Sequence, residues 1–203
     1  MKTHMSTADF WDGRYAAAAY AYGTQPNRGL EAFEPTLPRG ARVLLPGDGE
    51  GRNSVWLAQR GHSVLAVDQS AEGLRKAGHL ATTAGVEIEA LQADLANWAP
   101  QPRAFDALVL VYVHLPPEIR RDTHHRLLAA LKPGGMLFLE GFDRSHFGLP
   151  GGPRDPDWLF DAEELRADFA DCAELSLERI ETDLDEGQFH HGRARVLRVA
   201  GHR

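Results

Sequence analysis

Hydrophobic residues change their spacing along this chain, and those changes predict its secondary structure. From residue 41 onward, short apolar runs rich in β-branched residues alternate with longer stretches in which apolar residues recur every three or four positions. The first pattern is typical of strands and the second of helices. Strands are predicted at residues 41–45, 63–67, 86–92, 107–113 and 136–140, and helices at residues 53–60, 71–84 and 117–131.

The alternation of strands and helices predicts right-handed βαβ units, and therefore an α/β fold in which helices cover both faces of a parallel sheet. The end of the chain breaks this pattern. A helix is expected at residues 161–171, where Asp161 and Glu164 should form a capping box. Two strand-like runs follow at residues 175–182 and 193–200. Their connection is too short for a crossover helix, so they should form an antiparallel hairpin.

The first 35 residues precede the sheet and are rich in aromatic side chains. A helix is predicted at residues 9–19, followed by turn chemistry at residues 22–27 and a second helix from Leu30 to Phe33 that stops at Pro35. The aromatic side chains would otherwise expose a large apolar surface, so packing against the sheet is their simplest role. They are Trp11, Tyr15, Tyr20 and Tyr22.

Composition narrows the possible partners. A length of 203 residues, with 43% hydrophobic and 25% charged residues, suits a single soluble domain over residues 1–203. The one cysteine, Cys172, excludes an internal disulfide, and no N-terminal apolar run is long enough for secretion, so a cytoplasmic protein is expected. A net charge of -7 disfavours nucleic acid, since the cluster of Arg120, Arg121 and Arg126 is expected to be a solvated helix face. No membrane partner is expected, and both monomer and homodimer stay open.

A glycine-rich turn follows the first strand of the alternating region. Gly47, Gly49 and Gly51 stand before a helix, where glycine permits close backbone approach and helical N–H groups bind anions. Asp68 ends the next strand about 20 residues later, and an acid there can accept both ribose hydroxyl hydrogens. Asp94 follows the third strand, where a carboxylate could accept the adenine amino hydrogens. These residues together predict a nucleotide-type cofactor site at the carboxyl edge of the sheet.

Each of these residues also has a purely structural explanation. Asp68 could cap the following helix, Asp94 could belong to an ordinary turn, and a glycine-rich turn by itself is weak evidence. The anion at the helix start would be pyrophosphate in a dinucleotide enzyme and the methionine carboxylate in a methyltransferase. A nicotinamide-dependent oxidoreductase is therefore an alternative, although no second substrate domain is expected. A non-catalytic cofactor-binding or interaction module is another.

Several motifs resemble those of a known class. Four strings are similar to the successive motifs of class I S-adenosylmethionine-dependent methyltransferases, namely residues 44–53, 66–70, 105–108 and 131–135. Four more resemble the tellurite-resistance methyltransferase group and its uncharacterised bacterial relatives, namely residues 11–15, 22–27, 185–187 and 190–192.

The resemblance implies a Rossmann-like, doubly wound and mostly parallel sheet of seven strands in the order 3-2-1-4-5-7-6, ending in the antiparallel hairpin. It also implies S-adenosylmethionine as the cofactor and S-adenosylhomocysteine as the product. The cofactor-binding residues would be Gly47, Asp48, Gly49, Gly51, Asn53, Asp68, Gln69, Asp94, Leu95 and Val111. One departure is Leu45, which occupies the position where the class usually carries an acid, and Asp48 is the candidate to take over part of that role.

The expected topology brings the ends of the fourth and fifth strands and the hairpin bend to the rim beside the cofactor, so the methyl acceptor should bind there. This acceptor would be a small-molecule nucleophile, for which thiols, chalcogen oxyanions, hydroxyls and amines stay open. Histidine suits the removal of a proton from such groups. The candidates for catalysis are His190, His114, Glu140 and Tyr22. The candidates for acceptor binding are Trp11, Tyr22, His114, Phe142 and Arg154.

Some of these candidates have competing explanations. His114 could equally be a structural hydrogen-bond partner at the end of its strand, and His191 should point away from the rim. The histidines lack compact ligand spacing, so no metal site is expected. Residues 1–35 would form a helical lid, in which the subgroup resemblance implies that Tyr22 closes over the methyl donor. Residues 142–160 would be a substrate-side insert, because they exceed the length of a simple connection.

Overall fold

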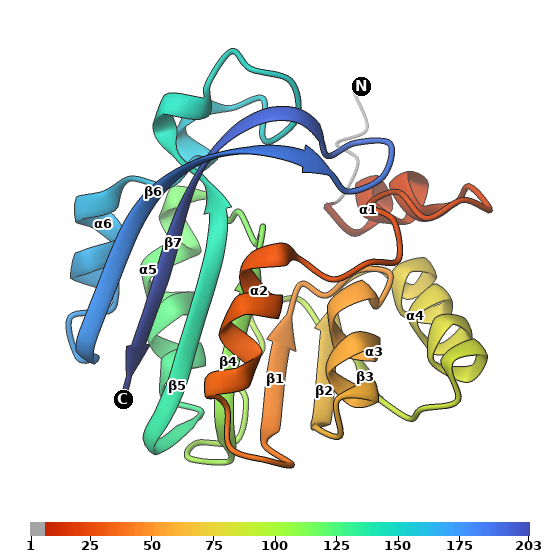
Figure 1. The fold of residues 1–203 in the computed structure, drawn as a ribbon. Coiled ribbons are helices and arrows are strands. Elements are labelled where there is room, and N and C mark those ends of the chain that lie inside the picture. The colour runs from red at the N-terminus through yellow and green to blue at the C-terminus, as the bar shows by residue number, and fades with distance from the viewer. Residues whose placement is uncertain (1–6) are drawn as a thin grey trace.

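Seven strands form one sheet in the computed structural model, which describes residues 7–203 (Figure 1). The strands are β1 (Arg42–Pro46), β2 (Ser63–Asp68), β3 (Glu89–Gln92), β4 (Phe105–Val111), β5 (Leu131–Phe142), β6 (Ala173–Asp185) and β7 (His191–His202). Their order in the sheet is β3-β2-β1-β4-β5-β7-β6. Strands β1 to β5 run parallel, whereas β7 is antiparallel to both β5 and β6. The predicted fold class and strand order are therefore confirmed.

Helices cover both faces of the sheet, as predicted. The helices are α1 (Thr7–Tyr15), α2 (Arg28–Phe33), α3 (Arg52–Gln59), α4 (Ala71–Ala84), α5 (Pro117–Leu128) and α6 (Ala162–Asp168), with short 3₁₀ turns at Glu34–Thr36, Arg144–His146 and Pro156–Trp158. Helices α2 and α3 lie on one face, and α5 and α6 on the other (Figure 1). Leu30 and Leu57 are buried in the apolar core of the first face. Leu127, Leu165 and Phe169 are buried in that of the second.

Strand β3 and helix α5 are both shorter than the sequence pattern predicts. Strand β3 begins at Glu89 rather than at Val86, and its residues are all exposed, since it lies at the edge of the sheet. Helix α5 ends at Leu128 rather than at Leu131, because Leu131 already begins β5 and pairs with Phe105. Periodicity alone therefore extends both elements too far.

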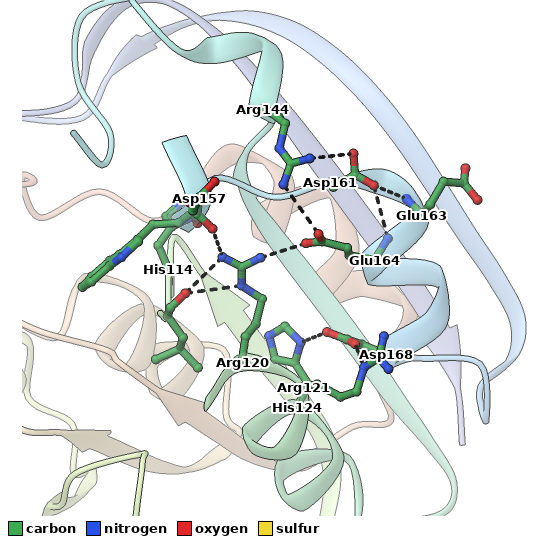
Figure 2. A network of polar contacts seen from close by, with 12 residues as sticks. His114, Arg120, Arg121, His124, Arg144, Asp157, Asp161, Glu163, Glu164 and Asp168 are labelled. Carbon is green, nitrogen blue, oxygen red and sulfur yellow. Dashed lines mark hydrogen bonds and ion pairs between the residues drawn. The ribbon is translucent and has the colours of Figure 1, made fainter. Parts of the chain in front are cut away.

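The N-terminus of α6 is capped differently from the prediction (Figure 2). Asp161 is the N-cap, as expected, and accepts hydrogen bonds from the backbone N–H groups of Glu163 (2.9 Å) and Glu164 (3.3 Å). The Glu164 carboxylate pairs instead with Arg120 (3.0 Å) and Arg144 (3.5 Å). The predicted capping box is thus wrong, because two arginines from other elements compete for its carboxylate.

The expected solvated face of three arginines is also wrong in part. The side chain of Arg120 is only 5% exposed, and it donates to the carbonyl oxygen of Leu115 (3.1 Å) as well as to the acid at the start of α6 (Figure 2). Arg126 donates to the carbonyl oxygen of Leu95 (2.7 Å). Arg121 stays on the surface, with 59% of its side chain exposed. Two of these arginines therefore hold loops in place, which leaves no free basic patch on this helix.

The N-terminal segment is anchored by one buried ammonium group. Helix α1 ends at Tyr15 rather than at Ala19, because Lys76 of α4 binds carbonyl oxygens that a longer helix would use internally. Its Nζ donates to the carbonyls of Tyr15 (3.4 Å), Ala17 (2.9 Å) and Ala19 (2.8 Å). It also pairs with the buried carboxylate of Glu50 in the glycine-rich turn. Lys76 thus ties this segment to the turn that carries the predicted cofactor site.

Replacing Lys76 by methionine should lower the free energy of unfolding by about 3–5 kcal/mol, because the Glu50 carboxylate would remain buried without its partner. Denaturant titration measures this loss. Lys132→Met is the matched control: Lys132 pairs with Asp106 (2.6 Å) while 44% of its side chain is exposed. This control should cost less than about 1 kcal/mol. Equal losses in the two variants would show that the buried pair does not anchor the segment.

Candidate functional site

The glycine-rich turn between β1 and α3 contains three left-handed backbone positions. The φ angle is 67° at Gly47, 62° at Gly49 and 89° at Gly51, a region that residues with side chains disfavour. Space is limited as well, since a Cβ at Gly47 would lie 2.9 Å from Val113 and one at Gly51 would lie 2.6 Å from Ala77. The turn therefore presents bare backbone and the start of α3 at the carboxyl edge of the sheet.

Two carboxylates stand at this turn, one of them buried (Asp68) and the other half-buried (Asp48). Asp68, at the end of β2, accepts hydrogen bonds from the N–H groups of Gly49 and Ser70, one on each oxygen and both at 2.8 Å. Asp48 accepts from the backbone N–H and the hydroxyl of Ser54. Burial, reinforced by the charge of Asp68, raises the pKa of Asp48 to about 6, and burial also raises the pKa of Asp68. Two carboxylates at one turn favour a cationic ligand.

The other predicted cofactor residues lie along the same edge but differ in exposure. Asn53 is buried in the first turn of α3, Gln69 directly follows β2, and Val111 ends β4. Leu95 is buried, whereas Asp94 is exposed and accepts a hydrogen bond from a backbone N–H two residues on (2.9 Å). The structure thus shows the turn-closing bond that the structural explanation of Asp94 predicts.

Two chain segments form a roof over the turn. They are residues 15–27 of the N-terminal segment and residues 186–190 at the bend of the β6–β7 hairpin, which reaches across to α1 (Figure 1). Their backbones touch, since a Cβ at Gly187 would lie 2.4 Å from the backbone nitrogen of Gly23. Both positions have a left-handed φ as well, 77° and 70° respectively. Glycine at both positions therefore allows the roof to close.

Tyr15 places a neutral phenol directly on the turn. A Cβ at Gly49 would lie 2.6 Å from its hydroxyl oxygen, and Trp11 stacks on its ring with a centroid distance of 5.5 Å. Burial and the nearby Asp68 carboxylate raise the pKa of Tyr15 well above its usual range. The stacking of Trp11, which is predicted to contact the acceptor, helps to hold the Tyr15 ring at the turn.

One buried asparagine joins the roof to the sheet. The backbone N–H of Asn27 donates to the side chain of Asn53 (2.9 Å), and its side-chain amide donates to Glu140 (2.7 Å) and Glu186 (3.3 Å). Glu140 also pairs with Arg198 of β7 (2.7 Å). Glu140 was predicted to be catalytic, but it is 3% exposed and fully engaged in this network. Its contacts favour a structural role.

An aromatic cage encloses His190 at the hairpin bend. The ring centroids of Tyr22 and Tyr112 lie 4.4 Å from that of the imidazole, and that of Phe142 lies 5.3 Å away. Nδ1 lies 3.3 Å from a Glu186 oxygen, whereas Nε2 has no hydrogen-bond partner in the described part of the chain. Burial lowers the pKa of His190, although Glu186 opposes that shift. A neutral imidazole whose Nδ1–H faces a carboxylate presents its Nε2 lone pair, as a general base requires.

His114, the second candidate base, is already engaged through both ring nitrogens. Nδ1 lies 2.9 Å from the carbonyl oxygen of Trp158, and Nε2 lies 3.1 Å from the backbone nitrogen of Phe142, whose N–H donates to it. Burial lowers the pKa of His114 to about 3, so the ring is neutral. His114 therefore joins β4 to β5 and to the following insert, and its geometry favours the structural explanation over proton transfer.

Comparison with known proteins decides the family. A family profile described as a methyltransferase domain matches residues 43–135, and the thiopurine S-methyltransferase of Bordetella petrii is 30% identical over 194 residues, or 84% of each chain. The chain belongs to the class I S-adenosylmethionine-dependent methyltransferases. The thiopurine S-methyltransferase of Vibrio cholerae is 28% identical over 187 residues, or 83% of each chain. TehB from Haemophilus influenzae shares the fold, with a TM-score of 0.73 and 16% identity over 97% of this chain and 66% of that one.

The methyltransferase therefore uses S-adenosylmethionine as its methyl donor. These matches give no support to an oxidoreductase or to a non-catalytic module. Within residues 7–203, no helix is long and apolar enough to cross a membrane. The same part of the chain contains no group of three or more His, Cys, Asp or Glu residues arranged to hold a metal ion.

Two residues of the site were missed from the sequence. Tyr112 directly follows Val111, and Arg52 directly follows Gly51, so each adjoins a predicted cofactor residue. That adjacency was the only available signal, because burial of a hydroxyl or of a guanidinium cannot be read from spacing. Arg154, which was predicted to contact the acceptor, is exposed in the insert.

Unfolding of the variant His114→Gln should depend less on pH than unfolding of the wild type. The pKa of His114 is about 3 in the folded protein and about 6.5 in the unfolded chain, so the unfolded state takes up the proton first as pH falls. Between about pH 6.5 and pH 5, this linkage should cost the wild type about 2 kcal/mol that the variant does not lose. Denaturant titrations near both pH values measure the difference, with the exposed His191→Gln as control. Parallel pH profiles for all three proteins would contradict a buried, neutral His114.

Proposed function

We propose that the methyltransferase transfers its methyl group to the sulfur of a small thiol, with His190 as the general base. The observation that carries this proposal is the neutral imidazole inside the aromatic cage, oriented by Glu186 through Nδ1. Aromatic rings attract polarizable sulfur and exclude water from the reacting atoms. Sulfur is also the atom named for the similar thiopurine S-methyltransferases. We therefore favour a thiol over chalcogen oxyanions, hydroxyls and amines as the acceptor.

The cofactor would be held by the glycine-rich turn, with Asp68 at its ribose and Asp94 and Leu95 at its adenine. Three features support this assignment. Gly47 and Gly49 leave bare backbone for close approach, Asp68 lies at the end of β2 beside the turn, and the carboxylates of Asp48 and Asp68 suit a positive sulfonium. When bound, the cofactor supplies the electrophilic methyl group of that sulfonium.

The residues of the protein then have three tasks. The aromatic cage orients the acceptor and keeps water away. Nε2 of His190 takes the proton of the acceptor S–H group, while Glu186 holds Nδ1–H and stabilises the resulting imidazolium. The methyl group would pass from the donor sulfur to the acceptor sulfur. The proton of the acceptor, held on His190, would then be released to solvent.

The N-terminal segment over residues 1–35 would act as a lid, and residues 142–160 would complete the acceptor side. The lid is supported by the roof contacts, and the insert by Phe142, which belongs to the aromatic cage. The proposal excludes nucleic acid as a partner, because the net charge is negative and the arginines of α5 leave no free basic patch on that helix. The protein is proposed to be a monomer or homodimer in the cytoplasm. The free thiol of Cys172 agrees with that compartment, because thiols are kept reduced there.

Asp68→Asn should weaken the binding of S-adenosylhomocysteine by about 1–3 kcal/mol, because an amide cannot accept hydrogens at both of its ends. Isothermal titration calorimetry measures this loss, and thermal unfolding reports whether the turn is retained. Asp106→Asn, at the start of β4 and therefore at the opposite edge of the sheet, is the control that should leave affinity unchanged. Wild-type affinity in Asp68→Asn would remove this residue from the cofactor site.

His190→Ala should lower turnover of a protonated alkyl thiol by about 10²-fold while leaving cofactor affinity intact. An aryl thiol that is already ionised should lose much less, because it needs no base. In the wild type, activity toward the alkyl thiol should fall as pH drops through an apparent pKa below about 6.5, since burial lowers the pKa of His190. Release of S-adenosylhomocysteine measures both effects.

His191→Ala is the matched control, since it removes an exposed histidine next to His190 along the chain. It should retain wild-type turnover with both thiols. Equal losses for the protonated and the ionised thiol in His190→Ala would show that the imidazole shapes the pocket rather than accepting a proton.

A further inference from the structure

Two buried polar groups beside His190 have no hydrogen-bond partner within the described residues. One is Nη1 of Arg52, whose side chain is only 8% exposed, and the other is the hydroxyl of Tyr112. Leaving a buried donor unpaired costs free energy, so such groups are rare and call for a partner. At the edge of a reaction site, that partner is a ligand.

Arg52 is aimed toward the acceptor side by the hairpin bend. Its Nη2 donates to a Glu186 oxygen (3.0 Å), and the same oxygen lies 3.3 Å from Nδ1 of His190. The guanidinium and the imidazole thus share one carboxylate. The positive charge of Arg52 acts on the titration of both Tyr112 and His190. The unused Nη1 therefore belongs to the surroundings of the base.

Tyr112 is held in a conformation that a residue with a side chain rarely adopts. Its φ angle is 55°, in the left-handed region, directly after the carboxyl end of β4. Its backbone N–H donates to the carbonyl oxygen of Glu140 (2.7 Å), and its ring packs against His190 and Phe142 at 4.4 and 4.8 Å. The phenol is neutral and is therefore a hydrogen-bond donor. Strain kept at such a position fits a hydroxyl whose placement matters for function.

The charges on the acceptor side do not balance. Arg198 pairs with Glu140 and Arg52 pairs with Glu186, but Arg14 of α1, whose guanidinium reaches the hydroxyl of the cage residue Tyr22, has no carboxylate partner in the described part of the chain. At the glycine-rich turn, Asp48 and Asp68 form no ion pair within the described residues, although the charge of Arg52 also acts on Asp48. A cationic donor and an anionic acceptor would complement these two sides.

We propose that Arg52 and Tyr112 form an anion subsite for a carboxylate or another oxyanion carried by the methyl acceptor. This inference rests on the proposed function to the extent that the acceptor occupies the aromatic cage. A guanidinium N–H and a phenol O–H both donate to the anion, and bonds of this charge-assisted kind are strong. The acceptor is then a small thiol with an acidic group, of the mercaptocarboxylate class. The amino-acid end of the cofactor also carries a carboxylate. The test therefore distinguishes an anion of the acceptor from the carboxylate of the cofactor.

A pair of aromatic thiols that differ in charge tests the subsite, namely para-mercaptobenzoate and para-mercaptobenzamide. Their dissociation constants are measured by calorimetry on the protein saturated with S-adenosylhomocysteine. The wild type should bind the benzoate at least about tenfold more tightly than the benzamide. Tyr112→Phe should reduce that preference about fivefold, and Arg52→Gln should abolish it.

Arg52→Gln leaves Glu186 without its arginine, and this variant could fail to fold. In that case Tyr112→Phe still tests the subsite. It removes only a hydroxyl that has no partner among the described residues. Tyr20→Phe is its matched control, because the Tyr20 hydroxyl donates to the carbonyl oxygen of Lys76 (3.3 Å), and it should leave the preference unchanged.

A second measurement compares the affinities for S-adenosylhomocysteine and methylthioadenosine, which lacks the amino-acid end. Their ratio should be the same in the wild type, Arg52→Gln and Tyr112→Phe. A ratio that collapses while the preference for the benzoate persists would assign the anion to the cofactor and overturn the proposal. Equal binding of the two thiols to the wild type, or binding of neither, would also overturn it. If the preference holds but His190→Ala retains full turnover, the subsite stands and the proposed base fails.

Discussion

The closed site depends on the hydrogen bonds of one buried residue, Asn27, which is 1% exposed. Its side-chain oxygen caps α2 by accepting from the N–H of Leu30, while its donors reach Asn53 on α3, Glu140 on β5 and Glu186 at the hairpin bend. Each of the three donated bonds joins the N-terminal segment to a different element. Withdrawal of this segment would deprive two buried carboxylates of a donor together, so the contacts form or break as a unit.

Glu186 connects the hydrogen bonds of Asn27 to the imidazole of His190. The same carboxylate accepts from Asn27, pairs with Arg52 and orients His190, and it lies on the hairpin that ends the chain. Orientation of the imidazole is thereby coupled to closure of the roof. If His190 is the base that we propose, its imidazole would be aligned only where water has been excluded, which suits a reaction whose main requirement is alignment.

The sequence was sufficient for features that depend on local spacing and insufficient for those that depend on distant contacts. Alternating periodicity and a short final connection predict the parallel sheet and its closing hairpin, whereas the strand order was implied by the family resemblance. The spacing of Asp68 from the glycine-rich turn predicts its place beside that turn, where it accepts from Gly49. The end of α1 does not follow from spacing, because Lys76 binds its carbonyls from another helix. His114 and His190 were both candidate bases, and only their partners distinguish them. His114 has both ring nitrogens engaged, whereas Nε2 of His190 has no hydrogen-bond partner among residues 7–203. The left-handed backbone of Tyr112 has no signature in the sequence at all.

The meeting of Gly23 and Gly187 separates two properties that are often entangled in enzymes. Gly23 and Gly187 meet through main chain alone, so their contact makes no demand on the neighbouring side chains. The side-chain bond between the same two segments, from Asn27 to Glu186, does make such a demand. Under the proposed function, evolution could therefore exchange cage residues for new acceptors and keep the roof fastened, provided that the two glycines and this pair are retained.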